Sequence, residues 1–351
     1  MACVKCTALA RRCRPGASNF LCWSPRHPGR GADARAVEER YIQARATMKH
    51  TIFQDSRIGA RPYQQDRLGQ WSSGEAMALA LADGLGGHLH GEVAAQLAVD
   101  CLGAAFRSEA RPRIEHPEAF LYRAIGRAHA MIVHQGQRMG LPDSPRTTIV
   151  ACLVQGGRAW WSFVGDSRLY LIRAGRLVTR TKDHTLVQQL VDAGRIREEA
   201  VAVHPDRNQL LRCLGGPITP LLEQVANAPL HKDDILLLCS DGFWGPLTQR
   251  QILMGLMGRL PAEALPELIE LAQTRAGKTC DNVSVLAMHW LEDDPAKPLP
   301  VPDARLDKTP PAGTDLGATT ADFLRVTAAE IESRIAHSRS APAKPDPGRK
   351  A

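Results

Sequence analysis

The feature that most restricts the fold of this chain is an apolar run that stops at an aspartate followed by a glycine. Residues 76–82 read AMALALA and lead directly into Asp83-Gly84. A second apolar run, ILLLC, is followed two residues later by another Asp-Gly pair, which begins at Asp241. Short apolar runs bounded by turn residues are typical of buried strands. The sequence therefore predicts carboxylates held at the ends of buried strands.

The rest of the chain divides into segments with helix or strand periodicity. The apolar stripe of an amphipathic helix is found in residues 92–106, 117–135, 184–194, 248–260 and 262–276. Strand-like runs occur at residues 75–83, 147–155, 158–166, 167–175, 233–242 and 281–290, and residues 50–66 read as a strand and a loop. The runs between 147 and 175 follow one another as hairpins, which favours antiparallel pairing. Pairs of helices around antiparallel strands predict a layered α/β sandwich.

The positive charge of the chain is concentrated at one end. The net charge is +7, but residues 1–47 hold nine Lys and Arg against three Asp and Glu. Residues 48–351 are therefore nearly neutral, which argues against a nucleic-acid-binding surface. The sequence also has no apolar run of the roughly 18 to 20 residues that a membrane-spanning helix needs. A cytoplasmic location is expected.

The nine cysteines are unevenly placed. Four crowd the first 22 residues, and the other five are scattered singly, mostly within apolar runs. That pattern indicates a reducing compartment rather than a framework of disulfides. Residues 1–47 are interpreted as a basic leader without a packed fold or as a misassigned start. Residues 295–351 read as a proline-rich linker and tail with one short amphipathic helix.

Three more aspartates occupy positions like those of Asp83 and Asp241. Asp281 opens a strand, Asp166 lies in a Gly-Asp-Ser turn between two strands, and Asp66 ends a loop. Gathered at one rim, such carboxylates would repel one another by several kcal/mol at ~4 Å. Divalent cations would relieve this repulsion, and ligands made only of oxygen favour Mg²⁺ or Mn²⁺. Gly84 would let its carbonyl oxygen reach such an ion because it has no side chain.

With its neighbouring motifs, this pattern resembles a known family. The elements that carry the resemblance occur in the order Arg61-x-x-x-Gln65-Asp66, Asp83-Gly84-x-Gly86-Gly87-His88-x-x-Gly91, Gly165-Asp166-Ser167-Arg168, Asp183-His184, Arg212-x-Leu214-Gly215, Ser240-Asp241-Gly242 and Asp281-Asn282. They are similar to those of the bacterial PPM-type (type 2C) metal-dependent serine/threonine protein phosphatases. The resemblance extends from about residue 51 to 291 and implies a phosphatase domain at 48–294. It also implies a four-layer α-β-β-α sandwich, with two mostly antiparallel central sheets flanked by pairs of helices.

The resemblance implies a role for each matched residue. Asp83 would bridge two Mn²⁺ or Mg²⁺ ions, and the Gly84 carbonyl would bind one of them. Asp241 and Asp281 would complete the shell of the other ion, and Asp166 would bind a third, weaker one. Arg61 would clamp the phosphate of a phosphoserine or phosphothreonine protein. A metal-activated bridging water would then attack phosphorus in line, without a covalent phosphoenzyme, and Asp66 would hold metal-bound water.

Two positions depart from the family pattern. Gln65 is neutral where many relatives carry glutamate, and this keeps open an alternative in which the chain is a pseudophosphatase that binds phosphoproteins without turnover. Leu85 stands where eukaryotic relatives place a histidine proposed as general acid, so metal-bound water or His88 would donate the proton. The expected partners are phosphoproteins made by a bacterial Ser/Thr kinase. The chain is expected to act as a monomer, without nucleic acid and without a membrane span.

Overall fold

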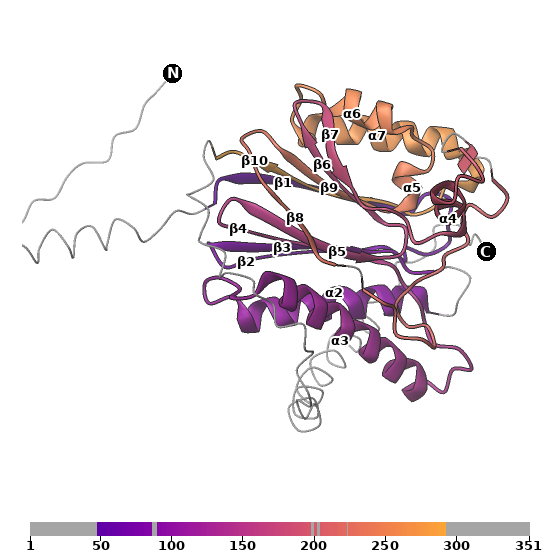
Figure 1. The fold of residues 1–351 in the computed structure, drawn as a ribbon. Coiled ribbons are helices and arrows are strands. Elements are labelled where there is room, and N and C mark those ends of the chain that lie inside the picture. The colour runs from indigo at the N-terminus through magenta and orange to yellow at the C-terminus, as the bar shows by residue number, and fades with distance from the viewer. Residues whose placement is uncertain (1–47, 86–89, 198–199, 202–203, 223, 293–351) are drawn as a thin grey trace, which may run out of the picture. The chain divides into compact units, whose positions relative to one another are not determined.

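The computed structural model describes residues 48–292, apart from 86–89, 198–199, 202–203 and 223. Within these ranges the strands form two five-stranded sheets with antiparallel pairing. Figure 1 shows the two sheets face to face, with α2 and α3 on one outer face and α6 and α7 on the other. The predicted fold, a four-layer α-β-β-α sandwich, is confirmed.

One sheet, sheet B, lies under the first two helices. Its strand order is β2-β3-β4-β5-β8, with bounds Arg67–Ser72, Ala76–Ala82, Ile149–Gln155, Arg158–Val164 and Ala226–Pro229. Helices α2 (Gly91–Glu109) and α3 (Pro117–Arg138) cover it. Every residue of β3 and β4 is buried, because these central strands have helices on one face and the second sheet on the other.

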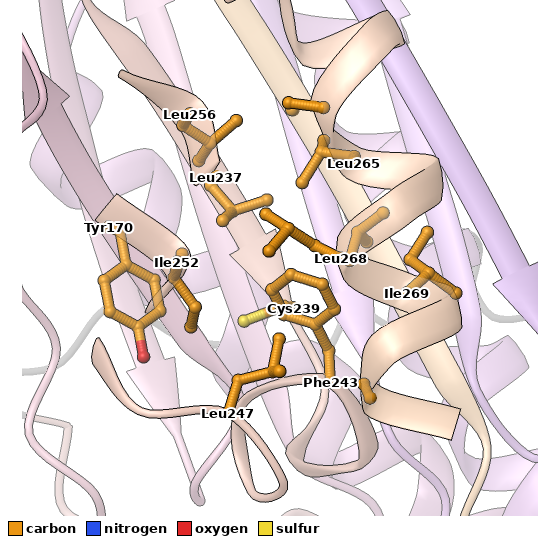
Figure 2. Close-up of a cluster of buried hydrophobic side chains, with 14 of the residues drawn as sticks. Tyr170, Leu237, Cys239, Phe243, Leu247, Ile252, Leu256, Leu265, Leu268 and Ile269 are labelled. Atoms are coloured by element: carbon orange, nitrogen blue, oxygen red, sulfur yellow. The ribbon is translucent and has the colours of Figure 1, made fainter. Parts of the chain in front are cut away.

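The other sheet, sheet A, has the strand order β1-β10-β9-β6-β7. The bounds of these strands are His50–Arg57, Val283–Trp290, Ile235–Cys239, Arg168–Arg173 and Arg176–Arg180. The helices that follow or cover its strands are α4 (Leu186–Asp192), α5 (Asp241–Trp244), α6 (Gln249–Leu256) and α7 (Pro261–Ala276), and the 3₁₀ turn η2 (Gly277–Thr279) leads into β10. Figure 2 shows how Leu265, Leu268 and Ile269 of α7 meet Leu237 and Cys239 of β9 in one apolar cluster.

A second apolar cluster fills the space between the two sheets. It joins Leu79 and Leu81 of β3 to Leu238 of β9 and Leu286 of β10, all fully buried. Alternate residues of a strand point to opposite faces, so β9 contributes Leu237 to the helix side and Leu238 to the sheet side. The strands whose ends carry the aspartates are therefore packed on both faces, against helices on one side and the other sheet on the other.

The structure differs from the sequence-based prediction in two details. Strands β2, β7 and β8 were not predicted. The Gly-Asp-Ser segment was read as a hairpin turn, but it leads from β5 in sheet B to β6 in sheet A and so crosses between layers. The residue that caps α4 is Thr185, whose hydroxyl accepts from the Gln188 amide.

Some predictions concern parts of the chain outside the described residues. These are the basic leader 1–47, the tail 295–351, and the loop residues Gly86, Gly87 and His88. Within the described ranges, none of the helices combines the length and the apolarity that crossing a bilayer requires.

Candidate metal centre

Asp83 follows β3 and has its backbone fixed by two threonines. The Asp83 amide donates to Thr148 Oγ1 at 3.0 Å, and the Thr148 amide donates to the Asp83 carbonyl oxygen at 2.8 Å. Thr147 Oγ1 donates to the same carbonyl oxygen at 2.8 Å. Both threonines are fully buried. Because the backbone groups of Asp83 are satisfied by β4 and its leading residues, its carboxylate is free for other partners.

Gly84 allows two segments to touch. A Cβ at this position would overlap the backbone carbonyl group of Gly91, the first residue of α2. The Gly84 amide donates to the Gln65 carbonyl oxygen at 3.3 Å, so the loop carrying Asp66 also lies against it. A larger residue would push α2 away from the strand end, so glycine is required here for packing as well as for access to its carbonyl.

Asp241 begins α5 directly after β9, and Asp281 lies just before β10. The two segments abut, because a Cβ at Gly242 would overlap the backbone oxygen of Asn282. The hydroxyl of Ser240 donates to Asp66 Oδ2 at 2.9 Å, and the amide of Ser284 donates to the Ser240 hydroxyl at 3.0 Å. The aspartates from loop 58–66, from β9 and from β10 thus meet at one end of sheet A.

The carboxylates at this rim raise one another's proton affinity. Burial raises the pKa of Asp83 well above its ordinary value, and the charges of Asp66, Asp241, Asp166 and Asp281 add to the effect. Burial, followed by the charges of Asp281 and Asp66, raises the pKa of Asp241 to about 7. Burial likewise raises the pKa of Asp66 to about 6, against hydrogen bonds from Ser284, Ser240 and Asp83 that lower it. The structure therefore brings these predicted residues together.

Asp166 joins the group from the crossing between the sheets. It is buried, and burial together with the charges of Asp241 and Asp183 raises its pKa well above the ordinary value. The neighbouring Ser167 hydroxyl lies 2.7 Å from Thr148 Oγ1. Thr148 is thus hydrogen-bonded both to Asp83 and to the segment that carries Asp166. It was missed from the sequence, where the pair Thr147-Thr148 before an apolar run was the available signal.

Arg61 lies on the loop between β1 and β2 and reaches the same rim. Its Nη2 pairs with Asp281 Oδ2 at 2.6 Å, and its side chain is about half exposed. The loop is held by Asn282, whose Nδ2 donates to the carbonyl oxygens of Ile58 and Tyr63 at 2.9 and 3.0 Å. The Asn282 Oδ1 accepts from the Gln65 amide at 2.8 Å. This buried amide side chain therefore positions the only guanidinium that the sequence assigned to the site.

The donor set fits a hard divalent cation. It consists of carboxylate oxygens and one backbone carbonyl, the ligands preferred by Mg²⁺ and Mn²⁺. Asp66 Oδ1 and Asp241 Oδ1 are buried and, in the described part of the chain, have no hydrogen-bond partner. In this conformation, the described residues contain no group of three or more Asp, Glu, His or Cys side chains that is arranged to hold a metal ion. Asp281 is paired with Arg61 instead.

Gln65 keeps its side chain within the site. Its Nε2 donates to Glu92 Oε2 of α2 at 3.3 Å. The neutral side chain at position 65 is thus next to a carboxylate that the sequence reading did not assign. Glu92 lies in the first turn of α2, and its side chain is 37% exposed.

The chain is similar to proteins of a known family. Residues 54–269 match the family model described as protein phosphatase 2C. The serine/threonine protein phosphatase PstP of Mycobacterium tuberculosis is 37% identical over 227 residues, which make up 64% of this chain but only 43% of PstP. The serine/threonine phosphatase stp of Listeria welshimeri is 31% identical over 241 residues, or 68% of this chain and 94% of that protein.

A solved structure agrees with the fold as well. The crystal structure of the catalytic domain of PstP in complex with two manganese ions is 33% identical, has a TM-score of 0.59, and covers 69% of this chain and 99% of that one. The family-model match spans more than half of the chain, and the resemblance seen in the motifs is confirmed. The chain therefore belongs to the protein phosphatase 2C family.

Proposed function

We propose that this chain is a metal-dependent protein phosphatase that hydrolyses phosphoserine and phosphothreonine in proteins. The observation that carries the proposal is the convergence of five aspartates, from segments far apart in the sequence, at one end of the sandwich, where Arg61 pairs with Asp281. A fold gains nothing from such crowding unless a cation neutralises it. The family and the names of its bacterial relatives supply the substrate class.

Manganese or magnesium is the proposed cofactor. The PstP structure with two manganese ions supports manganese. In this chain Asp83, the Gly84 carbonyl, Asp241 and Asp281 would hold two ions, and Asp166 a third. Bound there, the ions would lower the pKa of a water and neutralise charge on the phosphate.

The remaining proposed roles belong to Arg61 and Asp66. Arg61 is exposed enough to turn from Asp281 toward a phosphate, where its planar guanidinium can donate two parallel hydrogen bonds. Such a turn would free the Asp281 carboxylate for a cation. Asp66 is anchored through Oδ2 by Ser240, so its Oδ1 is the atom that can accept a hydrogen bond from water in the site. The side chain thus orients water without being free to move.

The proposed domain boundaries are 48–294. We further propose that the enzyme acts in the cytoplasm as a monomer on phosphoproteins made by a bacterial Ser/Thr kinase. Removal of residues 1–47 and 295–351 tests the boundaries, because it should leave the hydrolysis of a short phosphopeptide unchanged.

The proposal is tested by phosphate release from a phosphothreonine peptide by the full-length chain. Release should require MnCl₂, stop with excess EDTA and be lost in Asp83→Asn. Asp192→Asn is the matched control, because it makes the same chemical change in a half-exposed carboxylate of α4 paired with Lys182. A phosphotyrosine peptide should be hydrolysed poorly. Folded protein that binds the phosphothreonine peptide but releases no phosphate with Mn²⁺ would contradict the proposal in favour of a pseudophosphatase.

A further inference from the structure

Trp244 connects two of the segments that carry carboxylates. It is the last residue of α5, whose first residue is Asp241, so both side chains belong to one helical turn. Its indole Nε1 donates a hydrogen bond of 3.0 Å to the backbone oxygen of Asp166. The indole therefore links the helix after β9 to the crossing between the two sheets.

The indole is held in place by a buried guanidinium. Arg168 Cζ lies 3.4 Å from the centroid of the Trp244 ring, in a cation–π contact. The same guanidinium binds Asp183 in a bidentate pair, at 2.8 Å from Nε to Oδ1 and 2.7 Å from Nη2 to Oδ2. Its Nη1 also donates to the hydroxyl of Tyr170 at 3.1 Å. These bonds fix the plane of the guanidinium, so the ring lies against a rigid surface.

The segment around Asp166 needs support on this side. Gly165 has a φ of 108°, a conformation that other residues rarely adopt. The segment is attached to sheet B through the contact of Ser167 with Thr148. On the side of sheet A, the charges of Asp166 and Asp241 repel each other when both are ionised. The hydrogen bond from Trp244 opposes that repulsion at the backbone of Asp166.

We propose that Trp244 is a positioning residue that sets the separation of the Asp166 and Asp241 side chains and thereby the affinity of the chain for its most weakly bound divalent cation. The inference rests on the proposed function, in which both carboxylates bind metal. Trp244 acts through the Asp166 backbone, and Arg168 and Asp183 act by orienting the indole. The proposal gives a role to a residue that matches none of the motifs used to recognise the family.

The test is a calorimetric titration of full-length protein with MnCl₂. Trp244→Phe keeps an aromatic ring over Arg168 but removes the N–H donor. The weakest Mn²⁺ dissociation constant should rise about fivefold, the effect of one lost hydrogen bond, while the tighter binding steps stay unchanged. Trp244→Leu removes the ring as well and should raise that constant further. Trp160→Phe is the matched control, because Trp160 lies within β5 and pairs with Asn227 of β8.

Thermal melting separates positioning from a general loss of stability. Without metal, Trp244→Phe should melt within a few degrees of the wild type, but excess MnCl₂ should raise its melting temperature less. Equal isotherms for the wild type and Trp244→Phe would overturn the inference alone, as would the same fivefold change in Trp160→Phe. A wild-type chain that binds no Mn²⁺ would overturn both the inference and the proposed function.

Discussion

The two ends of strand β9 carry buried aspartates with opposite surroundings. Asp234, just before the strand, is fully buried and is paired by Arg173 through two bonds of 2.7 Å, with a third hydrogen bond from the His231 amide at 2.8 Å. Asp241, just after the strand, is surrounded by Asp66, Asp83 and Asp281. Arg61, which reaches the same rim, is bound to Asp281.

This difference separates a carboxylate that the protein pairs with a counter-charge from one that it surrounds with like charges. A buried charge is tolerated when the protein supplies its counter-charge, as Arg173 does for Asp234. At the other end of the strand, burial together with the negative charges of neighbouring carboxylates raises the pKa of Asp241 to about 7. The missing positive charge has to come from solution, and this is why we assign cation binding to one end of β9 only.

The largest expected effect is on catalysis, at Asp241. Asp241→Asn keeps the shape of the side chain but removes one of the charges that attract the cation. We expect Mn²⁺-dependent phosphate release to fall by about 10³-fold, roughly 4 kcal/mol of transition-state stabilisation. The melting temperature of the metal-free protein should stay the same or rise, because a repulsive charge is removed. A variant that keeps more than about a tenth of the wild-type rate would contradict the assignment.

The second effect is on stability, at the opposite end of the strand. Arg173→Met leaves Asp234 buried without its counter-charge, a change that typically costs about 3 kcal/mol. We expect a melting temperature lower by about 6 to 12 °C for a domain of this size. The turnover number of the folded protein should be unchanged. Arg176→Met, at an exposed position on the same hairpin, is the control and should change little. If Arg173→Met instead lowered the turnover number and left the melting temperature nearly unchanged, the distinction between the two ends of β9 would be lost.

The central strands could be predicted from the sequence, whereas most edge strands could not. β3 and β9 are buried throughout and appear as unbroken apolar runs, and β10, which is also buried, is interrupted only by Ser284 and His289. The strands that were missed, β2, β7 and β8, all lie at the edges of the sheets, where one side of the strand is unpaired. Their sequences, such as ANAP in β8, mix polar and small residues because they are only partly buried.

The carboxylates of the site could also be predicted, because each one marks the end of a strand or a turn next to one. Their supporting residues could not. Trp244 reaches Asp166 only because the chain crosses from sheet B to sheet A at that turn, and Asn282 reaches Ile58 across 224 positions of sequence. Such contacts depend on which strands become neighbours, and local patterns do not contain that information.

The smallest expected effect is the pH dependence of stability without metal. In the folded chain the pKa of Asp66 is about 6 and that of Asp241 about 7, above the ordinary value of an aspartate in an unfolded chain, ~3.9. Between these values the folded state binds more protons than the unfolded state, so the free energy of unfolding falls as the pH rises. The stabilisation of the folded state by these bound protons is fully present below about pH 4 and is lost as the pH rises through 6 to 7.

Melting curves from pH 5 to pH 8 in EDTA would measure this loss, which we expect to be on the order of 2 kcal/mol because the coupled carboxylates share protons. Other groups also titrate in this range, so the informative quantity is the difference between the wild type and Asp241→Asn, which should narrow toward pH 5. Excess MnCl₂ should remove the loss in the wild type, because a bound cation replaces the protons that the carboxylates release. If the difference in stability between the wild type and Asp241→Asn is independent of pH, the pKa of Asp241 is not raised by its neighbours. The contrast between the two ends of β9 would then have to rest on catalysis alone.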